Sequence, residues 1–411
     1  MSENKKLIPK RRFKEFENAD AWEQRELDIL ADFSKGSGYS KSDLVSTGEP
    51  VILYGRLYTN YETVIRDIDT FVNDISNSVL SKGGEVIVPS SGETAEDISR
   101  ASVVDSTGIA LGGDLNIIYP KAQIDSTFLA LTISNGNQKK ELSKRAQGKS
   151  VVHIRNEDLK KVLLVFPKKE EQKLIGRFFC SLDQTIAFQQ RKLEKMKSMK
   201  SAYLSEMFPA EGERKPKRRF PGFTDDWEQR ELGEIGEVTR TSINPNNYPN
   251  DEFIEYSMPA FDDGEKPQKV LGSTMLSSRL KLSGKSLLIN KLNVRQQRIW
   301  LVNEAEGNAV ASGEFLPYSS SEIDLSFLRQ FMLSDKATQD LESISSGTSN
   351  SQKRISPNDF LKYQVMIPTK KEEQVRIGQF FSNLDQTIAF QQQKLEKLQN
   401  IKKAYLNEMF I

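Results

Sequence analysis

An internal duplication constrains this chain more than any other feature of its sequence. The 38-residue stretch Glu171–Phe208 returns 202 positions later as Glu373–Phe410, with 26 of 38 positions identical. A shorter motif, an Arg-Phe pair followed by Trp-Glu-Gln-Arg-Glu-Leu, precedes each copy, once at Arg12 and Trp22–Leu27 and again at Arg219 and Trp227–Leu232. The repeat divides the chain into two halves, each with matched ends around a variable middle.

The length and the duplication together predict two variable domains and two repeat segments. A chain of 411 residues exceeds one ordinary core. We expect a first variable domain over 1–166, a first repeat segment over 167–208, a linker with the second variable domain over 209–367, and a second repeat segment over 368–411. The linker begins with the charged, Pro- and Gly-containing stretch 209–219, which is typical of an exposed connector.

The variable regions mix strand-type and helix-type signals. Short apolar runs such as Glu85–Val88 and Ser286–Ile289 are broken by Gly, Ser and Asn, as strands are. Phe128–Ile133 and Phe327–Leu333 favour short core helices instead. The fold class predicted is therefore α+β, with two similar domains related by a pseudo-two-fold duplication.

Each repeat segment predicts one long helix. Neither copy contains proline, and neither contains glycine after Gly176 or Gly378. A helix of 38 residues measures about 57 Å. Apolar residues recur at intervals of four and three, which is the coiled-coil pattern, so we expect the two helices to pair antiparallel. The alternative is that each helix lies singly on a domain surface.

Polar residues interrupt the predicted seam between the helices at the same places in both copies. Gln189 with Lys200, and Gln391 with Lys402, fall where apolar side chains are expected, and such residues can fix register. The residues predicted to form the helix-pair seam are Leu182, Ile186, Gln189, Leu193, Leu384, Ile388, Gln391 and Leu395.

Composition excludes several classes of function. The 58 basic and 57 acidic residues nearly cancel, so any contact with nucleic acid must depend on local clusters. A single histidine and a single cysteine exclude disulfide frameworks, zinc sites built from Cys and His, and most triads that use histidine as base. We expect neither a metal nor a cofactor.

Near matches to catalytic motifs each fail. Gly148-Lys149-Ser150 and Gly284-Lys285-Ser286 lack the glycine that a phosphate loop needs five residues earlier. Asn244–Tyr248 favours a turn, Asp262–Lys266 favours a solvated loop, and His153 favours a structural place at a strand end. The sequence therefore predicts a chain that is not itself an enzyme.

The sequence also indicates where the protein works. It holds no uninterrupted apolar run near the roughly 20 residues that span a bilayer. Its basic start is not followed by an apolar stretch or a cleavage site, so a secretory signal is not expected. We expect no membrane association and a cytoplasmic location.

The repeated segments resemble those of a known family. Each half closes with Ile-Gly-x-Phe-Phe, Leu-Asp, Lys-Leu-Glu and Tyr-Leu-x-Glu-Met-Phe, within Glu171–Phe208 and Glu373–Phe410. Ser345–Thr348 through Arg354–Ser356 close the second variable domain in the family's manner, whereas Gln147–Val151 in the first half is shorter and departs from it. Over nearly its whole length the chain resembles the specificity (S) subunits of type I restriction-modification enzymes.

That resemblance carries expectations about structure and partners. Such subunits hold two target-recognition domains apart with two antiparallel helices that act as a ruler. They bind double-stranded DNA at an asymmetric bipartite target, and they recruit two modification (M) subunits and restriction (R) subunits. Adenine methylation and restriction belong to those partners, so the resemblance implies a sequence-specific reader without catalysis of its own.

Candidate DNA-binding residues are those whose side chains suit base edges or phosphates. Arg forks pair with guanine and Asn or Gln amides with adenine, whereas lysines grip phosphates. The candidates are Arg56, Tyr58, Thr59, Asn60, Ser90, Ser91, Thr94 and Lys149 in the first half, and Lys291, Asn293, Arg295, Gln296, Gln297, Arg298, Thr348, Gln352 and Lys353 in the second. Two basic runs, Lys10–Arg12 and Lys215–Arg219, are either phosphate contacts or solvated linkers, and Arg295–Arg298 has a solvated strand edge as its alternative.

A function of another class stays open on the sequence alone. A duplicated coiled-coil scaffold, whose variable domains bind proteins and not DNA, would share the same repeat plan. Polar clusters able to read base edges are the feature that favours the DNA reader over this scaffold.

Overall fold

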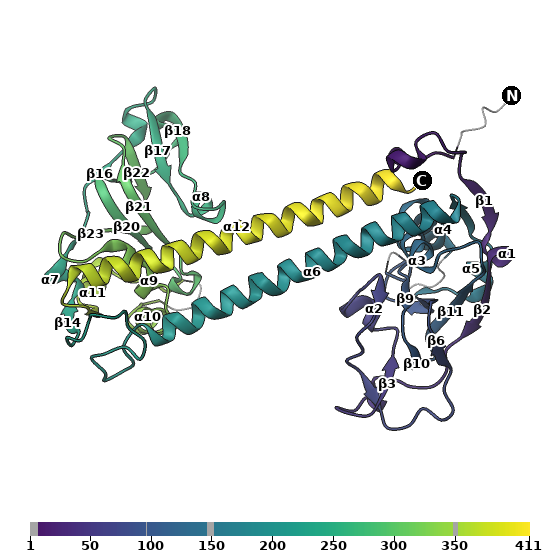
Figure 1. Cartoon of the computed structure of the whole chain (residues 1–411). Helices are drawn as coiled ribbons and strands as arrows, with labels where there is room; N and C mark the ends of the chain where they lie inside the picture. The colour runs from purple at the N-terminus through teal and green to yellow at the C-terminus, as the bar shows by residue number, and fades with distance from the viewer. Residues whose placement is uncertain (1–6, 96, 146–151, 348–351) are drawn as a thin grey trace. The chain divides into compact units, whose positions relative to one another are not determined.

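The computed structural model describes residues 7–95, 97–145, 152–347 and 352–411, which form two compact units (Figure 1). Unit 1 comprises Met1–Gln190 with Gln393–Ile411, and unit 2 comprises Arg191–Gln392. Each unit therefore combines one variable domain with the beginning of the long helix that follows it and the end of the other long helix.

Unit 1 contains a five-stranded sheet of order β2-β11-β7-β9-β4 and a four-stranded sheet of order β5-β3-β10-β6. The central strand β7 is buried at every residue because both of its faces are covered. The strands are β2 (Ala31–Lys35), β3 (Glu49–Ile52), β4 (Val64–Ile65), β5 (Phe71–Val72), β6 (Leu80–Lys82), β7 (Glu85–Pro89), β8 (Ser91–Gly92), β9 (Ser102–Val104), β10 (Thr107–Leu111), β11 (Leu115–Pro120) and β12 (Val152–His153). The shorter helices are η1 (Lys14–Phe16), α1 (Leu27–Leu30), η2 (Lys41–Asp43), α2 (Arg56–Thr59), α3 (Ser126–Ser134), α4 (Gly136–Arg145) and α5 (Asn156–Lys160).

Unit 2 contains a four-stranded sheet of order β15-β23-β20-β21 and a five-stranded sheet of order β16-β19-β22-β17-β18. These repeat the topology of unit 1, since β15-β23-β20-β21 matches β2-β11-β7-β9 and β18-β17-β22-β19 matches β5-β3-β10-β6. The strands are β15 (Glu237–Val238), β16 (Ser242–Ile243), β17 (Glu252–Tyr256), β18 (Gln268–Leu271), β19 (Arg279–Lys281), β20 (Gly284–Asn290), β21 (Ile299–Ala305), β22 (Ala309–Ser312) and β23 (Phe315–Ser319). The shorter helices are α7 (Leu232–Ile235), η3 (Pro245–Asn247), α8 (Met258–Asp262), η4 (Gly272–Thr274), η5 (Val294–Gln296), α9 (Leu325–Met332), α10 (Asp335–Ser343) and α11 (Pro357–Leu361).

The element types expected from the sequence are confirmed. The apolar runs at Glu85 and Ser286 lie in β7 and β20, and the two expected core helices are α3 and α9. Asn244–Tyr248 forms the turn η3, and Gly284-Lys285-Ser286 opens a strand and not a phosphate loop. The α+β fold with a long helix in each half is thus established.

The short repeated motif forms a strand that closes each variable domain at its base. β1 (Glu23–Glu26) pairs antiparallel with β13 (Leu163–Phe166), the strand that leads into the long helix α6 (Lys169–Glu206). In unit 2, β14 (Glu228–Glu231) pairs in the same way with β24 (Gln364–Ile367), which leads into α12 (Lys371–Met409). The matched ends of each half are therefore neighbours in space, and the variable region is an insert between them.

The opening Glu-Gln of each long helix anchors two other segments. Gln172 accepts a hydrogen bond from the backbone nitrogen of Asp125 at 2.9 Å, and Gln374 accepts one from Asp324 at 2.8 Å, so each glutamine holds the residue that caps α3 or α9. Gly378 lies against that same cap, where an added Cβ would sit 2.8 Å from the backbone nitrogen of Phe327. A glycine inside this helix is therefore required by close approach.

The glutamates bind the arginines of the repeated Arg-Phe motif. Arg12 donates to both carboxylate oxygens of Glu171, at 2.9 and 2.5 Å, and the two side chains are only 4% and 2% exposed. Arg219 makes the same two-pronged contact with Glu373, at 2.6 and 2.8 Å. These two arginines of the basic runs are thus neither phosphate contacts nor solvated linkers, because each is consumed by an ion pair.

The neighbouring arginines reach the other long helix of their unit. Arg11 contacts Glu408 of α12 at 2.5 Å and lies over the ring of Tyr405, 5.0 Å from its centre. Arg218 contacts Glu206 of α6 at 2.6 Å, so the second unit repeats the arrangement. Each Arg-Arg-Phe motif therefore links the start of one long helix to the end of the other through two ion pairs.

Within each unit the two long helices run antiparallel. In unit 1, Phe178 of α6 packs edge-on against Tyr405 of α12 at 5.2 Å between ring centres, and Asp183 binds Lys402 at 2.5 Å. Contacts in unit 2 follow the same rule: Tyr203 packs against Phe380 at 5.2 Å, and Lys200 binds Asp385 at 2.6 Å. Residue numbers rise along one helix as they fall along the other, which confirms the expected direction.

Lys200 and Lys402, which interrupt the predicted seam, each bind the aspartate of the Leu-Asp motif in the other long helix. We call these two lysines register pins, because their ion pairs fix the register of the two helices. Of the eight residues predicted to form the seam, Gln189, Leu193, Gln391 and Leu395 are buried, whereas Leu182, Ile186, Leu384 and Ile388 are partly buried. Their assignment to one continuous seam stays a prediction.

The buried arginine pair leads to a prediction about stability. Arg12→Met leaves Glu171 charged and buried, so we expect the free energy of unfolding of unit 1 to fall by about 3 to 5 kcal/mol. The exposed pair of Arg11 with Glu408 is screened by solvent and should contribute little to stability, which makes Arg11→Met the matched control. Urea unfolding followed by the fluorescence of Trp22, in a W227F/W300F background, reports on unit 1 alone. Equal losses for both variants would contradict the prediction.

Candidate nucleic-acid interface

The polar candidates of the second domain gather at the loop between β20 and β21. The backbone nitrogen of Asn293 donates to the carbonyl of Lys353 at 2.9 Å, and that of Ile355 donates to the carbonyl of Lys291 at 3.0 Å. Glu342 of α10 accepts from Arg295 at 2.5 Å and lies 3.8 Å from the Lys353 ammonium. The structure thus brings residues from two distant segments into one cluster.

The tip of this loop has an uncommon backbone conformation. Asn293 and Gln297 adopt left-handed φ values of 54° and 48° on either side of η5, which non-glycine residues adopt only at local cost. Arg295 and Gln296 between them are exposed. These two side chains are therefore the ones in the segment that point outward.

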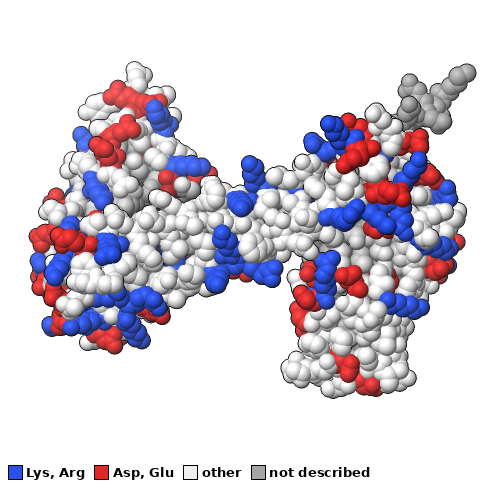
Figure 2. Space-filling model, in the orientation of Figure 1, with Lys and Arg blue, Asp and Glu red and all other residues white. Residues whose placement is uncertain are grey.

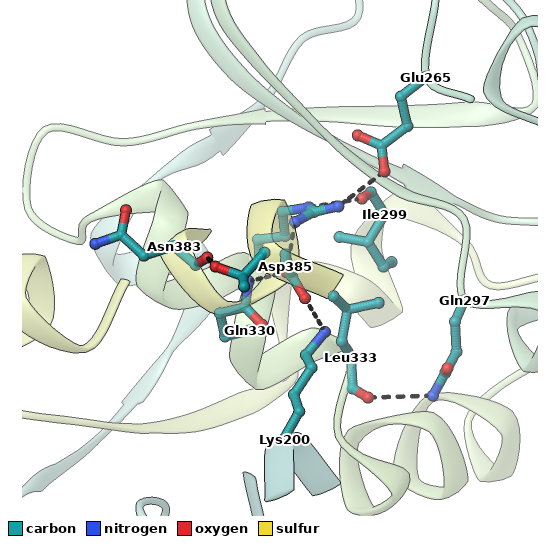
Figure 3. A network of polar contacts seen from close by, with 10 residues as sticks. Lys200, Glu265, Gln297, Ile299, Gln330, Leu333, Asn383 and Asp385 are labelled. Carbon is teal, nitrogen blue, oxygen red and sulfur yellow. Dashed lines mark hydrogen bonds and ion pairs between the residues drawn. The ribbon is translucent and has the colours of Figure 1, made fainter. Parts of the chain in front are cut away.

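The other two residues of that segment are only partly exposed, and their side chains also contact other parts of the domain. Arg298 holds Asp262 with both prongs of its guanidinium, at 2.8 and 2.7 Å, and this hydrogen-bonded arginine lowers the pKa of Asp262. Gln297 donates its amide to the carbonyl of Leu333 at 3.3 Å (Figure 3). The same amide donates to the hydroxyl of Thr338 at 2.8 Å. Gln297 consequently supports the loop against the α9–α10 junction.

A polar network joins this loop region to the helix pair (Figure 3). Asp385 of α12 accepts from Lys200 of α6 at 2.6 Å, from Arg329 at 3.3 Å and from Gln330 at 3.1 Å. Arg329 also binds Glu265 at 2.8 Å. The register pin of unit 2 is therefore continuous with the recognition domain.

The acidic loop Asp262–Lys266 is thus more than a solvated turn. Asp263, Gly264 and Lys266 are exposed, as expected. However, Asp262 and Glu265 hold Arg298 and Arg329, so two of the three carboxylates are structural.

In the first domain the structure brings two candidate segments together. The hydroxyl of Tyr58 donates to the carbonyl of Ser91 at 2.6 Å, and the hydroxyl of Ser91 lies 3.1 Å from Nδ1 of His153. Burial raises the pKa of Tyr58, so its phenol stays protonated and can donate. Thr59 and Asn60 are exposed beside this contact. His153 lies in the short strand β12, as expected.

Other candidates of the first domain are turned inward. Arg56 is 8% exposed and binds Glu62 at 2.8 Å, the carbonyl of Asp67 at 2.8 Å and the carboxylate of Asp69. Ser90 is buried, and its hydroxyl has no hydrogen-bond partner within the described residues. Arg56 therefore stabilises the domain and does not present its guanidinium at the surface.

The remaining candidates differ in their surroundings. Thr94 receives a hydrogen bond from the backbone of Asp97 at 3.1 Å and donates to its carboxylate at 2.6 Å, which is a local cap. Gln352 is exposed. Lys149 and Thr348 lie outside the described residues. Arg100, whose guanidinium lies 6.0 Å from the centre of the Tyr58 ring, was missed because one isolated arginine carries no sequence signal.

The two clusters occupy equivalent places in the two domains. Each follows a buried strand, β7 or β20, and each pairs with the segment after α4 or α10: Gly92 pairs with Val152, and Leu292 bridges to Arg354. The duplication therefore places one polar cluster at the same site of each domain.

Charge on the surface is local, as the composition requires. On the face drawn in Figure 2, basic and acidic side chains are interspersed over each unit. The part of the chain that the structure describes holds no group of three or more His, Cys, Asp or Glu side chains suited to a metal ion. Nor does any helix in the described ranges have the length and apolarity to cross a membrane.

Comparison with known proteins decides the family. Residues 19–198 and 224–400 match the type I restriction modification DNA specificity domain. The chain belongs to this family. Its function is DNA sequence recognition within a type I restriction-modification system, and the expectation drawn from the repeats is confirmed.

Solved structures share the fold. The S subunit of the type I restriction-modification system from M. genitalium is similar with a TM-score of 0.63 at 15% identity, over 98% of this chain and 99% of that one. A chain solved in work on complex assembly and conformational transition of the type I R-M system is similar with a TM-score of 0.50 at 14% identity, over 95% and 97%. The fold shared with these structures therefore extends over nearly the whole chain.

Variants of Arg298 and Asp262 distinguish base recognition by Arg298 from a structural role of this ion pair. If Arg298 reads a guanine, Arg298→Ala should cost about 1 to 3 kcal/mol of binding and relax one base position. Asp262→Asn weakens the hold on the guanidinium without removing it, so base preference should persist in this variant. Binding assays on single-base variants of the target measure both. The same relaxed preference in the two variants would show that the pair supports the loop and that Arg298 reads no base.

Proposed function

We propose that this specificity subunit reads an asymmetric bipartite DNA target and directs adenine methylation and restriction by partner subunits. The observation that carries the proposal is the placement of two unlike polar clusters at equivalent positions on a duplicated frame. Exposed Thr59 and Asn60 beside Tyr58 serve the first domain, and exposed Arg295 and Gln296 beside Asn293 serve the second. Because the clusters differ, the two half-sites differ.

The partners proposed are two M subunits and R subunits. The frame that the two halves share offers the same surface twice, which supports binding of two copies of one partner. Methylation and cleavage then belong to those subunits, and this chain needs neither a cofactor nor a metal for its part. Since the DNA of the host is its substrate, we place the complex in the cytoplasm.

Methylome sequencing tests this function against the protein-binding scaffold. A host that expresses the chain with its M subunits should acquire a methylated bipartite adenine motif that is missing without the gene. Unaltered methylation with normal complex assembly would support the scaffold instead.

The two helices are proposed to set the length of the unread spacer. An insertion of four residues after Lys195 lengthens α6 by ~6 Å, close to two base-pair steps of ~3.4 Å. We expect the methylated motif to gain spacer length, and a paired insertion after Lys397, the equivalent position of α12, to restore matched helices of the new length. Four residues added within the exposed stretch 210–215 serve as control. A motif of original spacing in the helix variants would refute the ruler.

The recognition domains are proposed to be exchangeable readers. Replacing residues 233 to 367 with the equivalent segment of another family member keeps the strand β14 and both long helices and exchanges β24 together with the domain. The methylated motif should then change in one half-site and keep the other. A change in both half-sites would show that the two domains do not read independently.

A further inference from the structure

Unit 1 has a hollow of about 940 Å³ between α4, the segment around Lys10 and the last turns of α12. Six lysines line it, and no Asp or Glu side chain does so: Lys10, Lys139, Lys140, Lys144, Lys402 and Lys403. A hollow of this size whose charged side chains are all basic attracts a counter-charge.

The charge of this lysine hollow is little compensated from within the protein. Lys402 is the register pin that binds Asp183 at 2.5 Å. Across residues 7–95, 97–145, 152–347 and 352–411, none of the other five lysines forms an ion pair. Their ammonium groups carry like charge around one hollow, so a bound anion would relieve their mutual repulsion.

Uncharged donors accompany the lysines. The lining also includes Asn135, Asn137, Ser143, Gln399 and Asn407. Such side chains, together with lysine, are the usual donors to the phosphates of nucleic acids. The composition of the lining therefore fits a chain of phosphates better than a single metal or an apolar ligand.

The lysine hollow continues toward the first recognition cluster. A second hollow, of about 330 Å³, shares Ser134, Asn135, Lys139, Lys402 and Leu406 with it and adds Tyr61, Thr63 and Arg100. Arg100 lies over the ring of Tyr58, which contacts Ser91. A basic path therefore leads from α4 and α12 to the residues proposed to face the first half-site.

Unit 2 keeps Lys217 and Lys200 in place of Lys10 and Lys402 but lacks the charges of Lys140, Lys144 and Lys403. Buried Leu142 of α4 corresponds to buried Leu341 of α10, which aligns the two helices. Lys140 and Lys144 are then replaced by Gln339 and Ser343, and the 202-residue repeat replaces Lys403 by Ser201. At these three positions, only unit 1 carries a positive charge.

We propose that the lysine hollow is a DNA phosphate-binding groove that grips the backbone beside the half-site read by the first domain. This inference rests on the proposed function and adds an asymmetry to it: phosphate grip is concentrated on one half of the target. The continuity with the Tyr58 cluster favours DNA over an acidic protein surface as the occupant. Lysines act here as point charges that position the duplex without reading its sequence.

The test replaces three exposed lysines with the residues that unit 2 has at the same places, K140Q/K144S/K403S. Binding of the target by the complex with its M subunits is measured across a series of salt concentrations. Each lost phosphate contact lowers the slope of log affinity against log salt by ~0.9, so the slope should fall by up to about 2.7. Preference among single-base variants of the target should not change.

A charge-matched control replaces three exposed lysines of unit 2, K281Q/K336N/K362Q. The groove is supported if the slope falls for the first triple variant and not for the control. Equal slopes in wild type and K140Q/K144S/K403S, or equal reductions in both triple variants, would overturn it. Weaker assembly with M or R subunits at unchanged DNA affinity would also overturn it and assign the hollow to an acidic protein surface.

The design separates this inference from the function on which it rests. If the wild-type complex shows no preference for a methylated motif over scrambled DNA, the proposed function fails. If it shows that preference while the triple variant keeps the wild-type slope, only the phosphate groove fails. Thermal unfolding of the triple variant verifies its fold, since Lys140, Lys144 and Lys403 are exposed.

Discussion

The ion pair between the repeated Arg-Phe motif and the first turn of each long helix is the interaction on which the architecture depends. It joins residues 159 positions apart in the first half and 154 in the second, with a whole domain between them. The pair is buried, so neither charge is stable without its partner. The variable region can then differ in sequence between the two halves, provided that its two ends meet at this ion pair and at the strand pair beside it.

The repeat plan and the long helices could be predicted from the sequence, whereas the residues that face DNA could not. Apolar periodicity and the absence of proline predict the long helices. The Leu-Asp motif is identical in both copies, which indicates that both copies use it in the same structural role. The function of a single polar residue depends on neighbours that the fold supplies. Arg56 and Arg298 have the same fork, which fits a carboxylate as well as a guanine edge, and Glu62 and Asp262 stand close enough to take it.

The same reasoning applies to lysine. Lys200 and Lys402 looked like interruptions of an apolar seam, and only the antiparallel register places Asp385 and Asp183 opposite them. Conversely, the lysines of α4 are unremarkable in the sequence, because they meet those of α12 only after the chain has folded. With net charge near zero, such local concentrations are how this protein can handle a polyanion.

Each unit completes its core with the end of the other half's helix. Phe208 packs on Phe381 and Phe327 in unit 2, and Phe410 packs on Phe179 and Phe128 in unit 1. During synthesis the ribosome therefore delivers everything that unit 2 needs by residue 392, whereas unit 1 must wait for Phe410. The domain that is made first is the last to close its core, and until then its exposed aromatic surface depends on protection from aggregation.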